Sequence, residues 1–144
     1  YKDKVSTYIS SSQEISEIAK QLIYEVDRRL EKDLYSDWLI MMPTIKAIVD
    51  HGLTEKDLRY LFDNGPRVGM HFVIGSEYAY LGNNINEVPK YLKGNAQWFM
   101  IGMRLMDQMF LDKPYNNREA RLASDEIYLH DRKQAIKLKI TKNG

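Results

Sequence analysis

The chain has 144 residues, of which 44% are hydrophobic and 28% are charged, and its formal net charge is +1. This composition is typical of a globular protein, and no apolar run approaches the roughly 20 residues that cross a bilayer as a helix. The absence of cysteine excludes disulfides, zinc–thiolate sites and cysteine nucleophiles, and it agrees with a reducing compartment.

The length fits one domain over residues 1–144. Because the chain starts at Tyr1, with neither an initiator methionine nor a signal-peptide pattern, we expect it to be part of a longer protein. From Lys113 onward eight basic and four acidic residues give a surplus of +4, which leaves −3 for residues 1–112. A solvated hairpin face is the favoured explanation of this surplus, a basic docking patch is the alternative, and we infer no binding of nucleic acid from it.

The first predicted elements are a strand and a long helix. Residues 5–10 alternate apolar and hydroxyl side chains, which indicates a short strand. Ser11 and Glu14 then have the spacing of a capping box, and a helix follows as far as Leu30. Its apolar stripe consists of Ile15, Ile18, Ala19, Leu22, Ile23, Val26 and Leu30.

The next predicted elements are a buried strand and a second helix. Residues 38–42 are continuously apolar, and Pro43 ends the strand because proline has no N–H to donate to a sheet. Residues 45–49 favour a short helical or irregular segment. Thr54 then has the residue type of a helix cap for residues 55–63.

Residues 64–77 predict the centre of the sheet. Gly65 is expected in the left-handed conformation that ends a helix, and Pro66 prevents the helix from continuing. Residues 70–74 are apolar and too short for a helix, so we expect a central strand buried on both faces, with His71 as a packed core residue. Residues 75–77 would follow at the strand's carboxyl end, where open α/β sheets bind ligands.

The remaining pattern predicts a loop at residues 78–84, a short helix at 87–93 and another apolar strand at 98–104. Four strands that alternate with helices indicate a mostly parallel sheet. Residues 126–130 and 135–140 alternate strictly and predict an antiparallel hairpin at the edge of that sheet.

The two faces of this predicted hairpin differ in character. Ile136, Leu138 and Ile140 share one face, whereas Lys137 and Lys139 share the other. Lysines on an edge strand also discourage pairing with a further chain.

Known catalytic motifs are absent from the sequence. It has no GxxxxGK[ST], GxGxxG, HExxH or GxSxG pattern. His51, His71 and His130 are too far apart in the sequence to suggest a metal cluster, so we expect no metal site. Methionines recur every three residues and favour core packing, with an adaptable binding groove as the alternative. They are Met100, Met103, Met106 and Met109.

The order of these elements resembles a known family. The strand at 38–42, a helix, and the segment GPRVGMHFVIGSE at 65–77 are similar to the second half of an FtsK/SpoIIIE-type ATPase domain, in which this segment reads approximately GRxxGIHLILATQ. Residues 88–92 (VPKYL), 101–108 (IGMRLMDQ) and 117–119 (NRE) extend the likeness. Over nearly its whole length the chain resembles the third, C-terminal, degenerate ATPase domain of Gram-positive type VII secretion motors.

The resemblance implies an α/β, RecA-like fold of the P-loop NTPase type. It has a mostly parallel sheet flanked by helices and a C-terminal antiparallel edge hairpin. The phosphate-binding loop of such a domain would precede Tyr1, so residues 1–144 would form a single domain fragment that lacks it.

The resemblance also identifies positions at which this sequence departs from an active ATPase. The acidic Walker B pair of the family, which holds Mg²⁺, falls on Pro43 and Thr44. The family's Thr-Gln sensor of the γ-phosphate falls on Ser76 and Glu77, and a carboxylate would repel phosphate. We therefore expect no catalytic residues and no cofactor here, although the family can bind ATP and Mg²⁺.

These departures favour a non-catalytic domain that acts in substrate recognition and in regulation of the secretion motor. The partners implied by the resemblance are secreted type VII substrates and neighbouring ATPase domains of the same motor. The expected location is the cytoplasmic face of the cell membrane, which the domain would reach only through its membrane-anchored parent protein. Two alternatives stay open: an active ATPase or DNA translocase whose P-loop lies upstream, and a purely structural oligomerisation domain.

The candidate partner-binding residues follow the central strand. Tyr78, Tyr80 and Leu81 are residue types suited to anchoring a helical partner. Alternatively, the tyrosines pack on the short helix at 87–93. Arg132 and Lys133, in the hairpin turn, are the second candidate contact.

Overall fold

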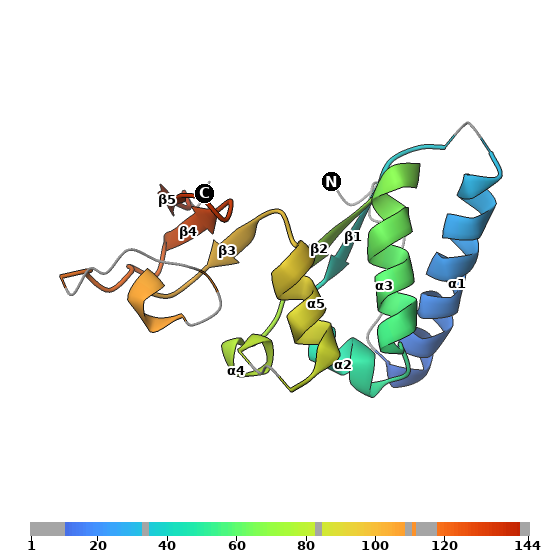
Figure 1. Ribbon diagram of the computed structural model, residues 1–144, viewed down its shortest axis with the longest axis horizontal. Helices are drawn as coiled ribbons and strands as arrows, with labels where there is room; N and C mark the ends of the chain where they lie inside the picture. Colours follow the sequence, from blue (N-terminus) through green and yellow to red (C-terminus); the bar gives the residue numbers. More distant parts are fainter. Residues whose placement is uncertain (1–10, 33–34, 83–84, 109–110, 112–117, 142–144) are drawn as a thin grey trace. The chain divides into compact units, whose positions relative to one another are not determined.

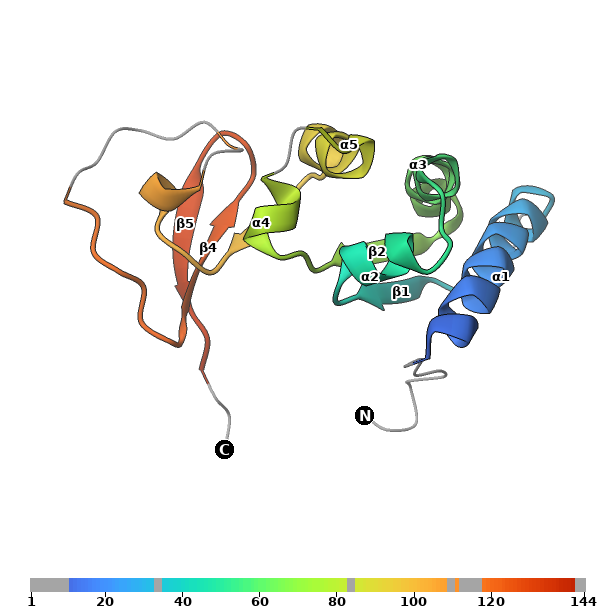
Figure 2. The same cartoon turned by 90° about the horizontal axis from the view of Figure 1, so that it is seen from below.

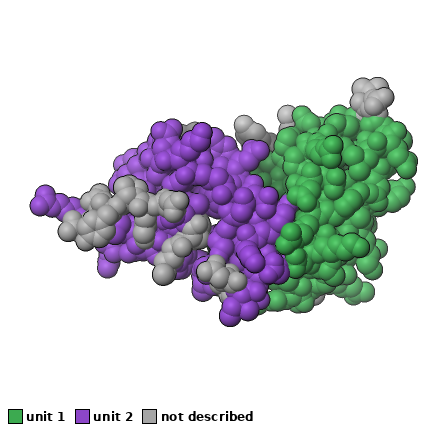
Figure 3. Space-filling model, in the orientation of Figure 1, with its two compact units in different colours: residues 1–77 green, residues 78–144 purple. Residues whose placement is uncertain are grey.

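The computed structural model describes residues 11–32, 35–82, 85–108, 111 and 118–141 (Figure 1). The chain forms two compact units: unit 1 is residues 1–77 and unit 2 is residues 78–144 (Figure 3). Within the described ranges, no helix has both the length and the apolar character needed to cross a membrane. The strand expected at residues 5–10 lies outside the described residues, and the assignment of the chain to one domain stays a prediction.

Unit 1 combines helices with a pair of parallel strands. Its elements are α1 (Ser12–Leu30), β1 (Trp38–Met42), α2 (Ile45–Asp50), α3 (Glu55–Asn64), the 3-10 helix η2 (Gly65–Val68) and β2 (Met70–Ile74). β1 and β2 pair in parallel, with Trp38 opposite Met70 and Met42 opposite Ile74. The mixed α/β class is therefore confirmed.

Capping boxes begin α1, as the sequence predicts, and α3, where the sequence predicts a cap at Thr54. The Ser11 hydroxyl accepts a hydrogen bond from the Glu14 backbone N–H, and the Glu14 carboxylate accepts one from the Ser11 N–H. Thr54 and Asp57 make the same reciprocal pair at α3. Each box satisfies two donors that a helix start would otherwise leave without partners.

A buried arginine joins three segments of unit 1. The Arg29 guanidinium donates to Glu25 Oε1 at 2.7 Å, to the Ser36 carbonyl at 2.8 Å and to the Val68 carbonyl at 3.0 Å. Arg29 is only 3% exposed. It connects α1 with the chain entering β1 and with η2, which leads into β2.

Glu25 and two aromatic rings complete the surroundings of this guanidinium. Arg28 donates two hydrogen bonds to Glu25, and together with Arg29 it outweighs desolvation and lowers the Glu25 pKa to about 2. The Arg29 guanidinium carbon lies 4.3 Å from the centroid of the Trp38 ring and 5.5 Å from that of Tyr35. The buried charge is thus paired with a carboxylate, two backbone carbonyls and two aromatic rings.

The end of α3 differs from the sequence prediction. Gly65 has φ −53°, so it is not left-handed, and α3 continues directly into η2. Gly69 takes the left-handed conformation instead, with φ 73°. Gly65 serves another purpose, because a Cβ there would lie 2.7 Å from the Phe72 ring.

The strand pair of unit 1 is covered on one face only. Met70 is fully buried, and Phe72 stacks edge-on against a phenylalanine of α3, which lies over one face of the pair in Figure 2. On the other face Leu39 is 66% and Met41 is 70% exposed. The expectation of strands buried on both faces is therefore wrong for the described residues. His71 is likewise exposed and not a core residue.

Unit 2 contains a separate, antiparallel sheet. Its elements are α4 (Tyr78–Leu81), α5 (Glu87–Asn95), β3 (Phe99–Ile101), the 3-10 helix η3 (Leu105–Asp107), β4 (Glu126–His130) and β5 (Ala135–Lys139). The strand order is β3-β4-β5, and the hairpin of β4 and β5 is confirmed. The strand expected at 98–104 is shorter and pairs antiparallel with β4, because an apolar run predicts a strand but not its partner.

Close backbone packing joins the carboxyl ends of β1 and β2. The Gly75 N–H donates to the Met42 carbonyl at 2.7 Å, and the Ile45 N–H donates to the Gly75 carbonyl at 3.0 Å. A Cβ on Gly75 would lie 2.2 Å from the Pro43 carbonyl oxygen. Only glycine therefore fits at this position without a backbone shift.

Replacing Gly75 with alanine is expected to destabilise unit 1 by about 2 kcal/mol, because the Pro43 backbone must move away and strain both hydrogen bonds. Urea unfolding followed by circular dichroism measures the effect. Gly94→Ala in α5 is the control, since no atom lies within 4 Å of the added Cβ and alanine favours a helix. A Gly75→Ala variant as stable as the parent would contradict the packing.

Candidate partner-binding surface

The structure brings Pro43, Thr44, Ser76 and Glu77 to one edge of the parallel pair. Pro43 and Thr44 follow β1, whereas Ser76 and Glu77 come just after β2. Pro43, Thr44 and Glu77 are exposed, and Ser76 is partly buried. The Ser76 hydroxyl donates to the Glu77 carbonyl at 3.1 Å, so it is engaged locally.

These four residues do not fit a magnesium nucleotide. Proline offers no side-chain ligand, threonine offers a neutral hydroxyl, and Glu77 is the one carboxylate of the four. Mg²⁺ prefers carboxylate and water oxygens in near-octahedral geometry. Among the residues that the structure describes, no group of three or more His, Cys, Asp or Glu could hold a metal ion. We assign no catalytic step to this edge.

Tyr78, Tyr80 and Leu81 lie in the short helix α4, where the sequence predicts a loop. The Gly82 N–H donates to the Tyr78 carbonyl at 2.7 Å and closes the turn. α4 contacts α5, whose Val88 and Leu92 are buried. All three candidate side chains are partly exposed. They form one short helical surface beside α5.

The second candidate contact lies in the four-residue turn between β4 and β5. One Asp131 carboxylate oxygen accepts the backbone N–H groups of Lys133 and Gln134 at 3.0 and 2.8 Å, which lowers the Asp131 pKa. Arg132 has φ 75°, in the left-handed region. Its N–H donates to Nδ1 of the buried His130 at 2.8 Å. The turn is therefore held by its own side chains.

The structure gives Arg132 and Lys133 different roles. The Arg132 guanidinium donates to the Ala96 carbonyl at 2.9 Å and to the Lys93 carbonyl at 2.6 Å, and it lies 5.3 Å from the Phe99 ring centroid. It thus caps the carboxyl end of α5. The Lys133 side chain is exposed and makes no ion pair within the described residues.

Sequence reasoning missed a carboxylate that holds η3 in place. The Glu119 carboxylate accepts the N–H groups of Leu105 and Met106 at 2.8 and 2.9 Å. Burial opposes ionisation of Glu119, but these bonds and one from Tyr128 outweigh it and lower the Glu119 pKa. Burial and the hydrogen bond to Glu119 raise the pKa of Tyr128. Nothing local in the sequence indicates this pairing.

Two further contacts stabilise the segment around η3. The side chain of Gln108, which is fully buried, donates to the Leu111 carbonyl at 2.9 Å and accepts the Leu111 N–H at 2.8 Å. Arg104 and Asp107 form a bidentate ion pair at 2.8 Å. Of the two motifs that carry the family resemblance, Glu119 of the second therefore binds the backbone of Leu105 and Met106 in the first.

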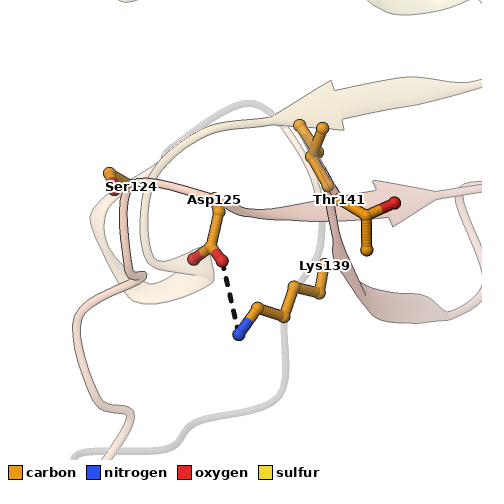
Figure 4. Close-up of a pocket in the computed structure, with 5 residues that line it drawn as sticks. Ser124, Asp125, Lys139 and Thr141 are labelled. Carbon is orange, nitrogen blue, oxygen red and sulfur yellow. Dashed lines mark ion pairs between the residues drawn. The ribbon is translucent and has the colours of Figure 1, made fainter. Parts of the chain in front are cut away.

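A shallow depression of about 410 Å³ lies near the start of β4 and the end of β5 (Figure 4). Its lining residues are Ser124, Asp125, Lys139, Ile140 and Thr141. Asp125 and Lys139 form an ion pair at 3.3 Å. Because the two charges neutralise each other, the depression has no surplus charge to attract an ion.

Comparison with known proteins gives consistent likenesses. No known family model matches the chain. The chain is 21% identical over 131 residues to the type VII secretion system protein EssC of several Staphylococcus aureus strains. The match covers 90% of the chain but only 9% of EssC.

Solved structures show the same relationship. EssC (ATPases 2 and 3) from Geobacillus thermodenitrificans has a TM-score of 0.75 and 11% identity, and the match covers 94% of this chain and 27% of that one. The cytoplasmic domain of the Thermomonospora curvata type VII secretion ATPase EccC has a TM-score of 0.64 and 16% identity, with 99% and 19% covered. These matches confirm the α/β fold and the resemblance to type VII secretion ATPase domains.

The contacts of Arg132 predict that it matters for stability whereas Lys133 does not. Arg132→Ala removes two charge-assisted bonds to the end of α5 and should lower the free energy of unfolding by about 1–2 kcal/mol. Alanine, like arginine, has a Cβ, so the cost of the left-handed backbone stays the same. Lys133→Ala should change stability by less than about 0.5 kcal/mol. Urea unfolding of both variants measures the difference. Equal stabilities would contradict a capping role for Arg132.

Proposed function

We propose that the chain is a non-catalytic, ATPase-like domain of a type VII protein secretion motor and that it acts in substrate recognition and motor regulation. The main support is the likeness to EssC over 90% of the chain, combined with Pro43 and Thr44 where the family resemblance expects the Walker B carboxylates. Such a domain works at the cytoplasmic face of the membrane. Its partners are secreted substrates and neighbouring ATPase domains.

The local chemistry supports a binding role over a catalytic one. General acid–base catalysis and Mg²⁺ binding need carboxylates or imidazoles near one another, and the edge formed by Pro43, Thr44, Ser76 and Glu77 has one exposed carboxylate. An active ATPase would need a phosphate-binding loop from elsewhere and a different source of metal ligands. We therefore place the function in exposed aromatic and apolar side chains.

The first test is nucleotide hydrolysis. We expect no ATPase rate above background at millimolar Mg·ATP, because Pro43 and Thr44 cannot hold Mg²⁺ or position the attacking water. Phosphate release over hours measures the rate, with a heat-denatured sample as the background. A Mg²⁺-dependent rate that disappears in Glu77→Ala would show that the edge is catalytic and would overturn the proposal.

The second test concerns the surface of α4. Changing Tyr78 and Tyr80 together to alanine is expected to weaken binding of a secreted type VII substrate or a neighbouring ATPase domain about tenfold, because aromatic anchors dominate such contacts. Isothermal titration measures the affinity, and a thermal melt measures stability. Ala79→Ser, at an exposed position of α4, is the control. A lower melting temperature with unchanged affinity would assign the tyrosines to packing.

A further inference from the structure

Two neighbouring methionines of β1 lie in opposite environments. Met41 is 70% exposed, whereas Met42, the next residue, is 4% exposed. Successive side chains of a strand point to opposite faces of the sheet, and the register places Met41 opposite Val73 and Met42 opposite Ile74. The same type of side chain therefore occurs in solvent and in the core of unit 1, one residue apart.

Unit 2 has an exposed methionine of the same kind. Met100 is the middle residue of β3 and is 66% exposed, whereas its two neighbours in the strand are buried. The other methionines that the structure describes are less accessible: Met70 is fully buried, and Met103 and Met106 are partly buried. Each unit thus has one described methionine with most of its surface in solvent.

Thioether sulfur is the group in this chain that reacts with peroxides. The sequence contains no cysteine, so the methionines are its only side chains with sulfur. A sulfur lone pair attacks the O–O bond of hydrogen peroxide, one oxygen atom is transferred to sulfur, and the peroxide is reduced to water while the thioether is oxidised to a sulfoxide. The peroxide must reach the sulfur, so an exposed methionine reacts directly and a buried one waits for the structure to open.

The position of the oxidised sulfur decides whether the fold tolerates the change. A sulfoxide is polar and accepts hydrogen bonds, so at Met41 or Met100 it would be solvated by water. At Met42 or Met70 the same group would enter an apolar core, where a polar group without a partner destabilises the folded state. The chain can therefore be oxidised at its two exposed methionines and remain folded.

We propose that Met41 and Met100 are sites of reversible oxidation, at which a peroxide converts the thioether to a sulfoxide in the folded protein. The modification makes the exposed sides of β1 and β3 more polar and leaves the core methionines unchanged. This inference rests on exposure and on thioether chemistry. It is independent of the ATPase-like assignment and concerns different residues from the proposed binding surface of α4.

The test treats the full chain with hydrogen peroxide, stops the reaction with catalase at intervals, and measures the oxidised fraction of each methionine by digestion and tandem mass spectrometry. Fragment ions separate Met41 from Met42. We expect Met41 and Met100 to be oxidised at least about tenfold faster than Met42 and Met70, because the buried pair reacts only after opening. In guanidinium chloride that unfolds the chain, the four rates should converge.

A matched pair of variants assigns the change in surface polarity. Leucine has nearly the volume of methionine and no sulfur, so Met41→Leu and Met42→Leu each remove one reactive site. Oxidation should shorten the retention of the parent chain on a hydrophobic-interaction column, by less in Met41→Leu and by the same amount in Met42→Leu. Methionine sulfoxide reductases A and B together should restore the retention. Thermal melts of the parent before and after oxidation should coincide.

Three results would overturn the proposal. Equal oxidation rates at Met41 and Met42 in the folded chain would show that exposure does not select the site. Oxidation of Met41 and Met100 as slow as that of Met70 would show that both thioethers are covered in solution. A lower melting temperature when only Met41 and Met100 are oxidised would show that these side chains belong to the packing and that the fold does not tolerate the modification.

Discussion

The buried guanidinium of Arg29 is the interaction on which unit 1 depends. A buried charge is costly unless it is paired and hydrogen-bonded, and Arg29, which is 3% exposed, has partners in α1, in the chain before β1 and in η2. These contacts fix where both strands begin, so they fix the parallel register of Trp38 with Met70. Gly75 then closes the pair at the opposite end. The edge that carries Glu77 is thus positioned from both ends of the strands.

Unit 2 depends on hydrogen bonds from side chains to the backbone of other segments and of neighbouring residues. Glu119 holds η3, Gln108 holds Leu111, and Arg132 holds the end of α5. Such bonds stabilise irregular segments that have few ladder or helix bonds of their own. One of them also engages a predicted binding residue, because the Arg132 guanidinium that caps α5 is less available to a partner. Lys133 is the contrasting case, with an exposed ammonium.

The proposal that α4 binds a partner has a physical basis in the side chains that the two units expose. The edge at Pro43 and Glu77 lacks the groups for phosphate chemistry, while unit 2 presents apolar and aromatic side chains to solvent. Exposed apolar surface lowers solubility unless another surface covers it. The residue types of this edge therefore agree with the proposed contact role.

Short-range signals in the sequence determined the elements of this protein. The caps at Ser11 and Thr54 and the alternation in β4 and β5 depend on residues a few positions apart, so the elements can be predicted from local pattern. Only the tertiary structure decided that β3 pairs antiparallel with β4, that Leu39 and Met41 are exposed on one face of the β1–β2 pair, and that Arg132 caps α5. The reason is that pairing, burial and capping depend on residues tens of positions apart, whose meeting no local pattern encodes.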